Sequence, residues 1–311
     1  MKKIILNILM AKPSMYSKSI ILNLLGMQWY RIIFFYLLRV LRPTKKIQPK
    51  YEKYLKELEK EGVVAIPNFF SEEDYQKLLE EYERLIPLFS DTNHGLLPHV
   101  DGMNIHDKRV SSATKQLFLN NELINSIVPA YLNRKLHLPT PIEFNRIYCS
   151  KDEASLPKNG GTNNLHFDAP MRIAKAFYYI HDINEDNGAL RYCKKSQKRN
   201  SLKRLLFEYK LSVRYAINKW NKNDEGEYKD NDPWVAITEK EIKKHNLKEE
   251  PISGKGNTLV IFDVGGFHRR GDNYSVTRDT VQINYRNINT IRNEFYPIEK
   301  KLLKLMAKNR S

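Results

Sequence analysis

The stretch GNTLVIFDVGGFHRRGDNYSVTRDTVQINYR, residues 256–286, contains the strongest fold signal in the sequence. Its first part, residues 257–263, is a short apolar run rich in β-branched and aromatic residues, which is typical of a buried strand. The pair Gly265-Gly266 follows, where the backbone can bend sharply, and His268 comes soon after it. The run therefore predicts a strand and a tight turn that lead to a histidine.

A second strand is predicted in residues 277–286. Polar and apolar residues alternate there with the period of a strand, so each kind occupies one face. The polar face consists of Arg278, Thr280, Gln282 and Asn284. A polar face on a core strand needs a wet interior, so the sheet is expected to enclose a site.

Similar short runs precede this stretch and are separated by turn residues. They cover residues 141–150, 165–170, 174–183 and 188–193. The β-rich core is therefore expected to extend from about residue 136 to about residue 290. A charged, mostly helical insertion interrupts it from about residue 197 to about residue 250. The predicted class is α+β with a mainly β core and flanking N-terminal helices.

Helices are predicted on the N-terminal side of this core. A short charged helix is expected over residues 51–61. A serine cap, an acidic first turn and apolar residues at i, i+3, i+4 and i+7 predict a second helix over residues 71–86. Residues 90–113 are expected to be loop-like, and another helix is expected over residues 114–135.

Length and composition predict one large domain with appendages. The chain has 311 residues, of which 41% are hydrophobic and 11% aromatic, enough for a sizeable core. We expect a basic segment over residues 1–50 and one folded domain over residues 51–311. Two cysteines, Cys149 and Cys193, do not make a disulfide framework, so a cytoplasmic location is expected.

The positive charge of the chain is concentrated at its N-terminus. The formal net charge is +16, and residues 1–50 contain ten Lys or Arg and no acidic residue, which leaves +6 for the rest. A nucleic-acid-binding domain is expected to carry its basic residues on the folded core. The distribution therefore disfavours nucleic acid as a partner.

Residues 19–41 of this segment are rich in Leu, Ile and aromatic residues. The stretch between Lys18 and Arg31 has 12 residues without a charge, well short of the roughly 20 that span a bilayer. An imperfect amphipathic helix with basic flanks suits a peripheral position on an anionic membrane surface. Peripheral membrane contact through residues 1–45 is one prediction, and a helix packed on the protein's own core is the other. The apolar region is too short for a signal peptide.

A candidate metal site lies in LHFDAP, residues 165–170. His166 and Asp168 are two positions apart on a predicted strand, so their side chains project to the same side. His268 is the natural third ligand, because it follows a core strand and a glycine turn. Two imidazoles and one carboxylate form the facial triad of non-haem Fe(II) oxygenases.

A rival arrangement is present elsewhere in the chain. His99 and Asp101 are also two positions apart, with His94 and His106 nearby. They lie in a stretch rich in Gly, Asn and Pro without flanking strands, which disfavours them as the iron site. A contribution of this loop to substrate binding stays open.

A cation for a 2-oxoacid co-substrate is expected in the same interior. Arg278 is ten residues after His268 and belongs to the polar face of its strand. The planar fork of an arginine can hold a carboxylate with two hydrogen bonds, which a lysine cannot do. The other arginines that could take this role are Arg269, Arg270 and Arg286.

With these features the sequence resembles the phytanoyl-CoA dioxygenase-like Fe(II)/2-oxoglutarate oxygenases. The resemblance runs in order from about residue 60 to about residue 290, through EGVVAIPNFFSEEDYQKLLEEYERL, LHFDAP, AFYYIHDINEDNGALRYCKKSQK and the stretch quoted first. It implies a double-stranded β-helix, the cupin-like jelly roll. It implies Fe(II) on His166, Asp168 and His268, and 2-oxoglutarate on Arg278. Tyr148 and Phe177 are candidates to line the 2-oxoglutarate pocket.

The chain also departs from the family pattern. The turn after its Asn-Gly strand is Lys194-Lys195-Ser196-Gln197, where the family usually has a Pro-Gly-Ser-His-like turn. The spacing from His268 to Arg278 is ten residues, where eleven is common. Because of this second departure, Arg269, Arg270 and Arg286 stay alternatives to Arg278 as the partner of the 2-oxoglutarate carboxylate.

The predicted function is hydroxylation of an aliphatic carbon of a small molecule, with O2 and 2-oxoglutarate as co-substrates. The carboxylate of Asp168 disfavours halogenation, because related halogenases lack it to make room for halide. Desaturation and ring formation stay open, and the basic segment suggests a lipid-linked or amphipathic substrate. The alternatives are a cupin-like metal-dependent isomerase or hydrolase and a non-catalytic basic membrane-associated binding protein.

Overall fold

The computed structural model describes residues 19–41, 46–92, 100–133, 140–148, 164–168, 172–220, 237–272 and 277–285. The helices are α2 (Ile20–Leu24), α3 (Met27–Val40), α4 (Glu52–Glu61), α5 (Glu72–Leu85), α6 (Ser112–Leu119), α7 (Glu122–Leu132), α8 (Leu202–Trp220) and α9 (Glu239–His245). The strands are β1 (Val63–Ile66), β2 (Ser90–Asp91), β3 (Val100–Asn104), β4 (Thr140–Ile147), β5 (Ala174–Tyr179), β6 (Leu190–Tyr192), β7 (Glu250–Ile252), β8 (Thr258–Asp263), β9 (His268–Arg269) and β10 (Arg278–Asn284).

These strands form two antiparallel sheets. The larger sheet has seven strands in the order β1-β8-β5-β10-β4-β3-β2, and the smaller has three in the order β7-β6-β9. An apolar cluster joins them face to face, because it contains Tyr192 and Ile252 of the smaller sheet beside Val260 and Phe262 of the larger. Two such facing sheets are the arrangement expected of a jelly roll.

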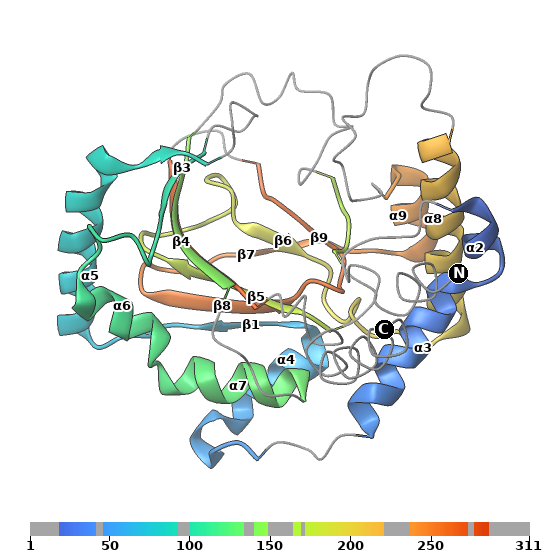
Figure 1. The fold of residues 1–311 in the computed structure, drawn as a ribbon, viewed down its shortest axis with the longest axis horizontal. Helices are drawn as coiled ribbons and strands as arrows, with labels where there is room; N and C mark the ends of the chain where they lie inside the picture. The colour runs from blue at the N-terminus through green and yellow to red at the C-terminus, as the bar shows by residue number, and fades with distance from the viewer. Residues whose placement is uncertain are drawn as a thin grey trace, which may run out of the picture.

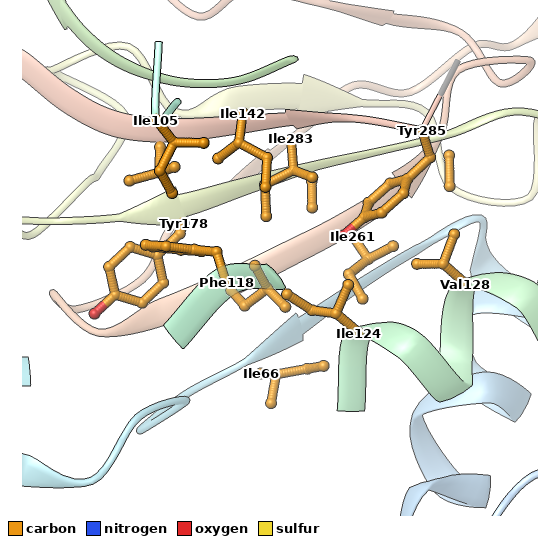
Figure 2. Packing of buried hydrophobic residues seen from close by; sticks show 14 of the residues in the cluster. Ile66, Ile105, Phe118, Ile124, Val128, Ile142, Tyr178, Ile261, Ile283 and Tyr285 are labelled. Carbon is orange, nitrogen blue, oxygen red and sulfur yellow. The ribbon is translucent and has the colours of Figure 1, made fainter. Parts of the chain in front are cut away.

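Helices cover the other face of the larger sheet (Figure 1). Helices α4 to α7 contribute apolar side chains to a second cluster that contains Ile261 of β8 and Ile283 of β10. Figure 2 shows Ile124 and Val128 of α7 and Phe118 of α6 packed against strand residues of this core. Each central strand is therefore buried on both faces, one against helices and one against the smaller sheet.

Helix α5 confirms the predicted helix over residues 71–86. The side chain of its N-cap Ser71 accepts a hydrogen bond from the backbone N–H of Asp74 at 3.2 Å. The first turn holds three acidic residues, which favour the positive end of the helix dipole. The buried residues on its inner face are Leu78, Tyr82 and Leu85.

Two predictions for the region before β4 were wrong. Residues 90–113 were expected to be loop-like, but β3 pairs along β4, where Gly102 lies opposite Asn145. A Cβ at Gly102 would come within 2.4 Å of the Phe144 carbonyl oxygen, so pairing depends on this glycine. The helix expected over residues 114–135 is two helices, α6 and α7, because Asn121 caps a new helix by accepting from Ile124 N–H.

Helices α2 and α3 lie beside α8 at one end of the molecule (Figure 1). Trp29 Nε1 donates to the Leu205 carbonyl oxygen at 2.8 Å, and the Trp29 and Tyr209 rings are 5.0 Å apart. The described part of the N-terminal segment therefore packs on the protein itself, on the predicted insertion. None of the described helices combines the length and the apolar character that crossing a membrane requires.

Candidate metal centre

Two backbone segments, residues 164–168 and 264–268, bring the predicted ligands together. The N–H of His166 donates to the carbonyl oxygen of His268 at 3.0 Å, and the N–H of His268 donates to that of His166 at 2.9 Å. Asp168 is fixed by its own N–H, which donates to the Val264 carbonyl oxygen at 2.8 Å. Residues 165–170 were predicted as a strand, but in the described part of this stretch His166 forms an isolated β-bridge with His268. This bridge places two distant segments side by side.

The side chains of His166, Asp168 and His268 form one compact group. The Asp168 Oδ1 atom lies 3.4 Å from His166 Nε2 and 3.8 Å from His268 Nε2. One donor atom from each residue lies within 4.8 Å of the others, and all three residues are buried. Within the described residues, this is the group of His, Cys, Asp and Glu side chains with the spacing of a metal site.

Both imidazoles are oriented by backbone carbonyl groups. His166 Nδ1 lies 2.6 Å from the Asn164 carbonyl oxygen, and His268 Nδ1 lies 2.9 Å from the Gly266 carbonyl oxygen. A carbonyl oxygen only accepts, so each Nδ1 carries the proton and each Nε2 keeps its lone pair. Metal-ligating histidines are commonly held in this way. The donor set therefore fits a divalent iron with open positions for other ligands.

The charges around the centre favour ligands in their metal-binding forms. Burial would raise the pKa of Asp168, but the Lys175 ammonium, 2.6 Å from Asp168 Oδ2, holds this pKa well below its usual range. Burial and the neighbouring His166 lower the pKa of His268 to about 3. Asp168 is thus an anion and His268 is neutral around pH 7.

A buried ionic cluster supports both segments from the side of α8. Glu208 Oε1 accepts from Arg199 Nε at 2.6 Å and from Arg204 Nε at 2.7 Å. Both guanidinium groups also donate to the Gly265 carbonyl oxygen, at 2.9 and 3.3 Å. The Arg204 guanidinium lies 3.7 Å from the centre of the Phe267 ring, next to His268. We name Arg199, Arg204 and Glu208 the α8 cluster.

Arg278 and Phe177 lie on the face of the larger sheet that contacts the smaller one. Gln282 of β10 is opposite Phe177, and Phe177 is opposite Val260 of the cluster between the sheets. Opposite residues share a face, and alternation places Arg278 on it too. The Phe177 ring is 5.3 Å from that of Phe262, which is 5.4 Å from the His268 ring. Arg278 is 7% exposed and donates to the Gly188 carbonyl oxygen.

Tyr148 has a different set of contacts. Its hydroxyl donates to Asp101 Oδ2 at 3.0 Å, beside the ion pair of Arg146 and Asp279. Neither partner belongs to the group around His166. The role of Tyr148 in the 2-oxoglutarate pocket stays a prediction.

The rival residues are placed as follows. Arg269 is paired with Glu249 at 2.6 Å and with Asp272 at 3.2 Å, so its charge is already balanced. His106 is exposed. Asp101 of the rival pair lies on β3, and Arg270 is half-buried. His94, His99 and Arg286 lie outside the described residues.

Two features of the centre were not predicted from the sequence. Lys175 lies on the same face of β5 as Phe177 and Tyr179. A lysine in line with two aromatic residues was the signal in the sequence that could have identified it. The α8 cluster had no such signal, because its members fall in a charged insertion whose docking position depends on tertiary structure.

The sequence profile of one family, described as phytanoyl-CoA dioxygenase (PhyH), matches residues 58–275 of the chain. No curated protein sequence matches it. Among solved structures, the epimerase SnoN in complex with Fe3+, α-ketoglutarate and nogalamycin RO is similar, with a TM-score of 0.51 and 13% identity. That match covers 76% of this chain and 82% of the other.

Two further structures are similar at lower TM-scores. HygX from Streptomyces hygroscopicus, with nickel, 2-oxoglutarate and hygromycin B bound, has a TM-score of 0.46 and 12% identity over 75% of this chain and 85% of its own. A Pseudomonas putida prolyl-4-hydroxylase has a TM-score of 0.46 and 12% identity over 76% of this chain and 98% of its own. The family match and the SnoN similarity confirm the predicted jelly-roll fold.

Proposed function

Because the chain belongs to the phytanoyl-CoA dioxygenase family, we propose that it hydroxylates an aliphatic carbon of a small amphipathic molecule at the centre formed by His166, Asp168 and His268. Membership makes the protein a non-haem iron- and 2-oxoglutarate-dependent oxygenase. The hydroxylation, the substrate class and the individual residue roles are the proposed part.

The observation that carries the ligand assignment is the orientation of the two histidines. With each Nδ1 donating to a backbone carbonyl, both Nε2 atoms are left on the side of Asp168 Oδ1. Bound iron with 2-oxoglutarate and O2 supplies an oxidant strong enough to cleave an unactivated C–H bond. The protein holds the ligands, excludes water and positions one C–H bond of the substrate.

Arg278 is the proposed partner of the distal carboxylate of 2-oxoglutarate. It is buried on the face between the sheets, where a desolvated guanidinium forms strong charge-assisted hydrogen bonds with a carboxylate. Arg269 is the weaker candidate, since Glu249 and Asp272 already engage its guanidinium. Phe177 would supply an apolar wall beside this co-substrate.

Asp168 favours hydroxylation over halogenation. Its carboxylate occupies the position that a halide would need, and its N–H and Lys175 both hold it there. Hydroxylation inserts one oxygen atom of O2 into the product, so a product that gains oxygen distinguishes it from desaturation and ring formation.

We also propose that the enzyme is cytoplasmic and that residues 1–45 bring it to a membrane surface. The positive charge of this segment complements the negative charge of an anionic bilayer. A substrate with an apolar chain would be concentrated at such a surface, which supports the amphipathic class.

A turnover assay tests the proposed function. The iron-loaded full chain is incubated with 2-oxoglutarate, O2 and a panel of amphipathic and water-soluble metabolites, and succinate is measured. Succinate formation stimulated by an amphipathic compound, with oxygen gained by that compound, is the expected result. Asp168→Ala should abolish it, and His99→Ala, from the rival His-x-Asp pair, should retain it. The opposite pattern would assign the iron to the loop around His99.

A further inference from the structure

Helices α2 and α3, with the residue that follows each of them, expose nine large apolar side chains. On α3 the exposed residues recur every three or four positions, which places them along one side of the helix. We name the set the outer stripe, and it consists of Ile21, Leu24, Leu25, Tyr30, Ile33, Tyr36, Leu37, Val40 and Leu41, each 43% to 80% exposed. Single exposed apolar residues are ordinary, but a patch of this extent marks an interaction surface.

The polar residues of the same helices face the protein. Asn23, Gln28 and Arg31 are 0%, 1% and 4% exposed. Asn23 Nδ2 donates to the Ser212 carbonyl oxygen at 2.8 Å, and Gln28 Nε2 donates to Glu208 Oε2 at 3.3 Å. A surface helix usually turns its apolar side to the protein and its polar side to water. In this segment the two sides are exchanged. Its polar side fastens it to α8, and its apolar side is left outward.

We propose that the outer stripe is the surface through which the protein inserts into the interface of an anionic bilayer. This inference rests on the proposed membrane contact of residues 1–45 and names the face that makes it. A helix of 14 residues is about 21 Å long at 1.5 Å per residue and would lie in the plane of the interface. Tyr30 and Tyr36 suit the depth of the headgroups, and the aliphatic residues suit the acyl boundary.

Charge favours a bilayer over a second copy of the chain. Arg31 is buried on the side of α8, and no acidic residue within residues 1–50 offsets the other nine basic residues, so joining two copies of this segment would bring like charges together. An anionic membrane complements the same charges. Helix α8 adds two exposed leucines, Leu202 and Leu206. They are close in sequence to Leu205, whose carbonyl oxygen accepts from Trp29.

Flotation with liposomes tests this assignment. The full-length protein is mixed with vesicles of phosphatidylcholine alone or with phosphatidylserine, and the floated fraction is measured at low and high salt. We expect flotation with the anionic vesicles that decreases as salt increases. The variant Ile33→Asp/Leu37→Asp should reduce the bound fraction at least tenfold. The matched control Leu88→Asp changes an exposed apolar residue outside the stripe and should bind as the wild type does.

The outcomes separate the inference from the proposal beneath it. If the wild type fails to float with anionic vesicles, the proposed membrane contact is wrong. If the wild type floats and Ile33→Asp/Leu37→Asp floats equally, the contact is made by other residues and the outer stripe is not the surface. If the variant instead turns a wild-type dimer into a monomer, the stripe joins two copies. Unchanged 2-oxoglutarate turnover without vesicles verifies that the variant is folded.

Discussion

The backbones of His166 and His268 are hydrogen-bonded to each other in both directions, at 3.0 and 2.9 Å. This pairing places the centres of the two imidazole rings 4.6 Å apart. Because the main chain sets the separation, backbone pairing holds the two candidate ligands side by side. Preorganised ligands of this kind depend on the residues that support them, and these residues make testable predictions.

Lys175 is predicted to control the metal affinity through Asp168. Its ammonium holds Asp168 Oδ2 at 2.6 Å, which leaves Oδ1 toward the imidazoles. Lys175→Met should weaken Mn(II) or Co(II) binding by about 10- to 100-fold, because a supporting partner of a ligand is lost. Calorimetric titration measures this. Lys255→Met is the control, because it removes an ion pair of similar N–O distance with the exposed Asp182, and it should leave the metal affinity unchanged.

Arg278 is predicted to bind the co-substrate and not the metal. Arg278→Ala should weaken 2-oxoglutarate binding to the metal-loaded protein by about tenfold or more, since a charge-assisted pair contributes about 1.5–3 kcal/mol. Mn(II) affinity should stay the same. Arg269→Ala is the matched variant, and an effect in it alone would move the role to Arg269.

The α8 cluster is predicted to stabilise the fold. Glu208 is fully buried between two guanidinium groups, and Glu208→Gln would remove the negative charge that both of them pair with. A loss of about 3–5 kcal/mol in the free energy of unfolding is expected. Urea denaturation measures it. Glu241 of α9 forms a partly exposed ion pair with Arg214 of α8, and Glu241→Gln should lower the free energy of unfolding by about 1 kcal/mol or less. Equal losses in both variants would contradict the role of burial.

His181 is predicted to make stability depend on pH. Its hydrogen bond with Asp279 raises the pKa of His181 above the ordinary value of 6.5. The protonated form is favoured by folding, so this contribution is complete below pH 6.5 and is lost as the pH rises through the higher pKa of the folded state. Chemical denaturation across this range should show the decrease in wild type and its absence in His181→Gln. A flat wild-type profile would argue against the interaction.

Local patterns sufficed for much of the fold. The cap and period of residues 71–86 predicted α5. The spacing of His166 and Asp168 predicted that both side chains meet at one site, although an isolated bridge holds them there and not the predicted strand. Val100–Asn104 was missed because Gly102 and its polar neighbours have little intrinsic preference for a strand, and pairing with β4 decides their structure.

The N-terminal helices show what a pattern leaves open. The period of residues 19–41 indicated two unlike faces, but it could not say which face meets the protein. That choice depends on Glu208 and on carbonyl groups of α8, about 180 residues away in the sequence. Lys175 is a similar case, since its role follows from β5 lying beside the segment that carries Asp168.

Iron binding by triad variants tests the central claim most directly. Fe(II) is equilibrated without oxygen against the wild type, Asp168→Ala, His268→Ala and His99→Ala, and the bound metal is measured after dialysis. The account predicts a single Fe(II) per chain in the wild type and in His99→Ala, and a loss of affinity of about 100-fold or more when a ligand is removed. Full Fe(II) affinity in His268→Ala together with its loss in His99→Ala would contradict the account and place the iron in the rival loop.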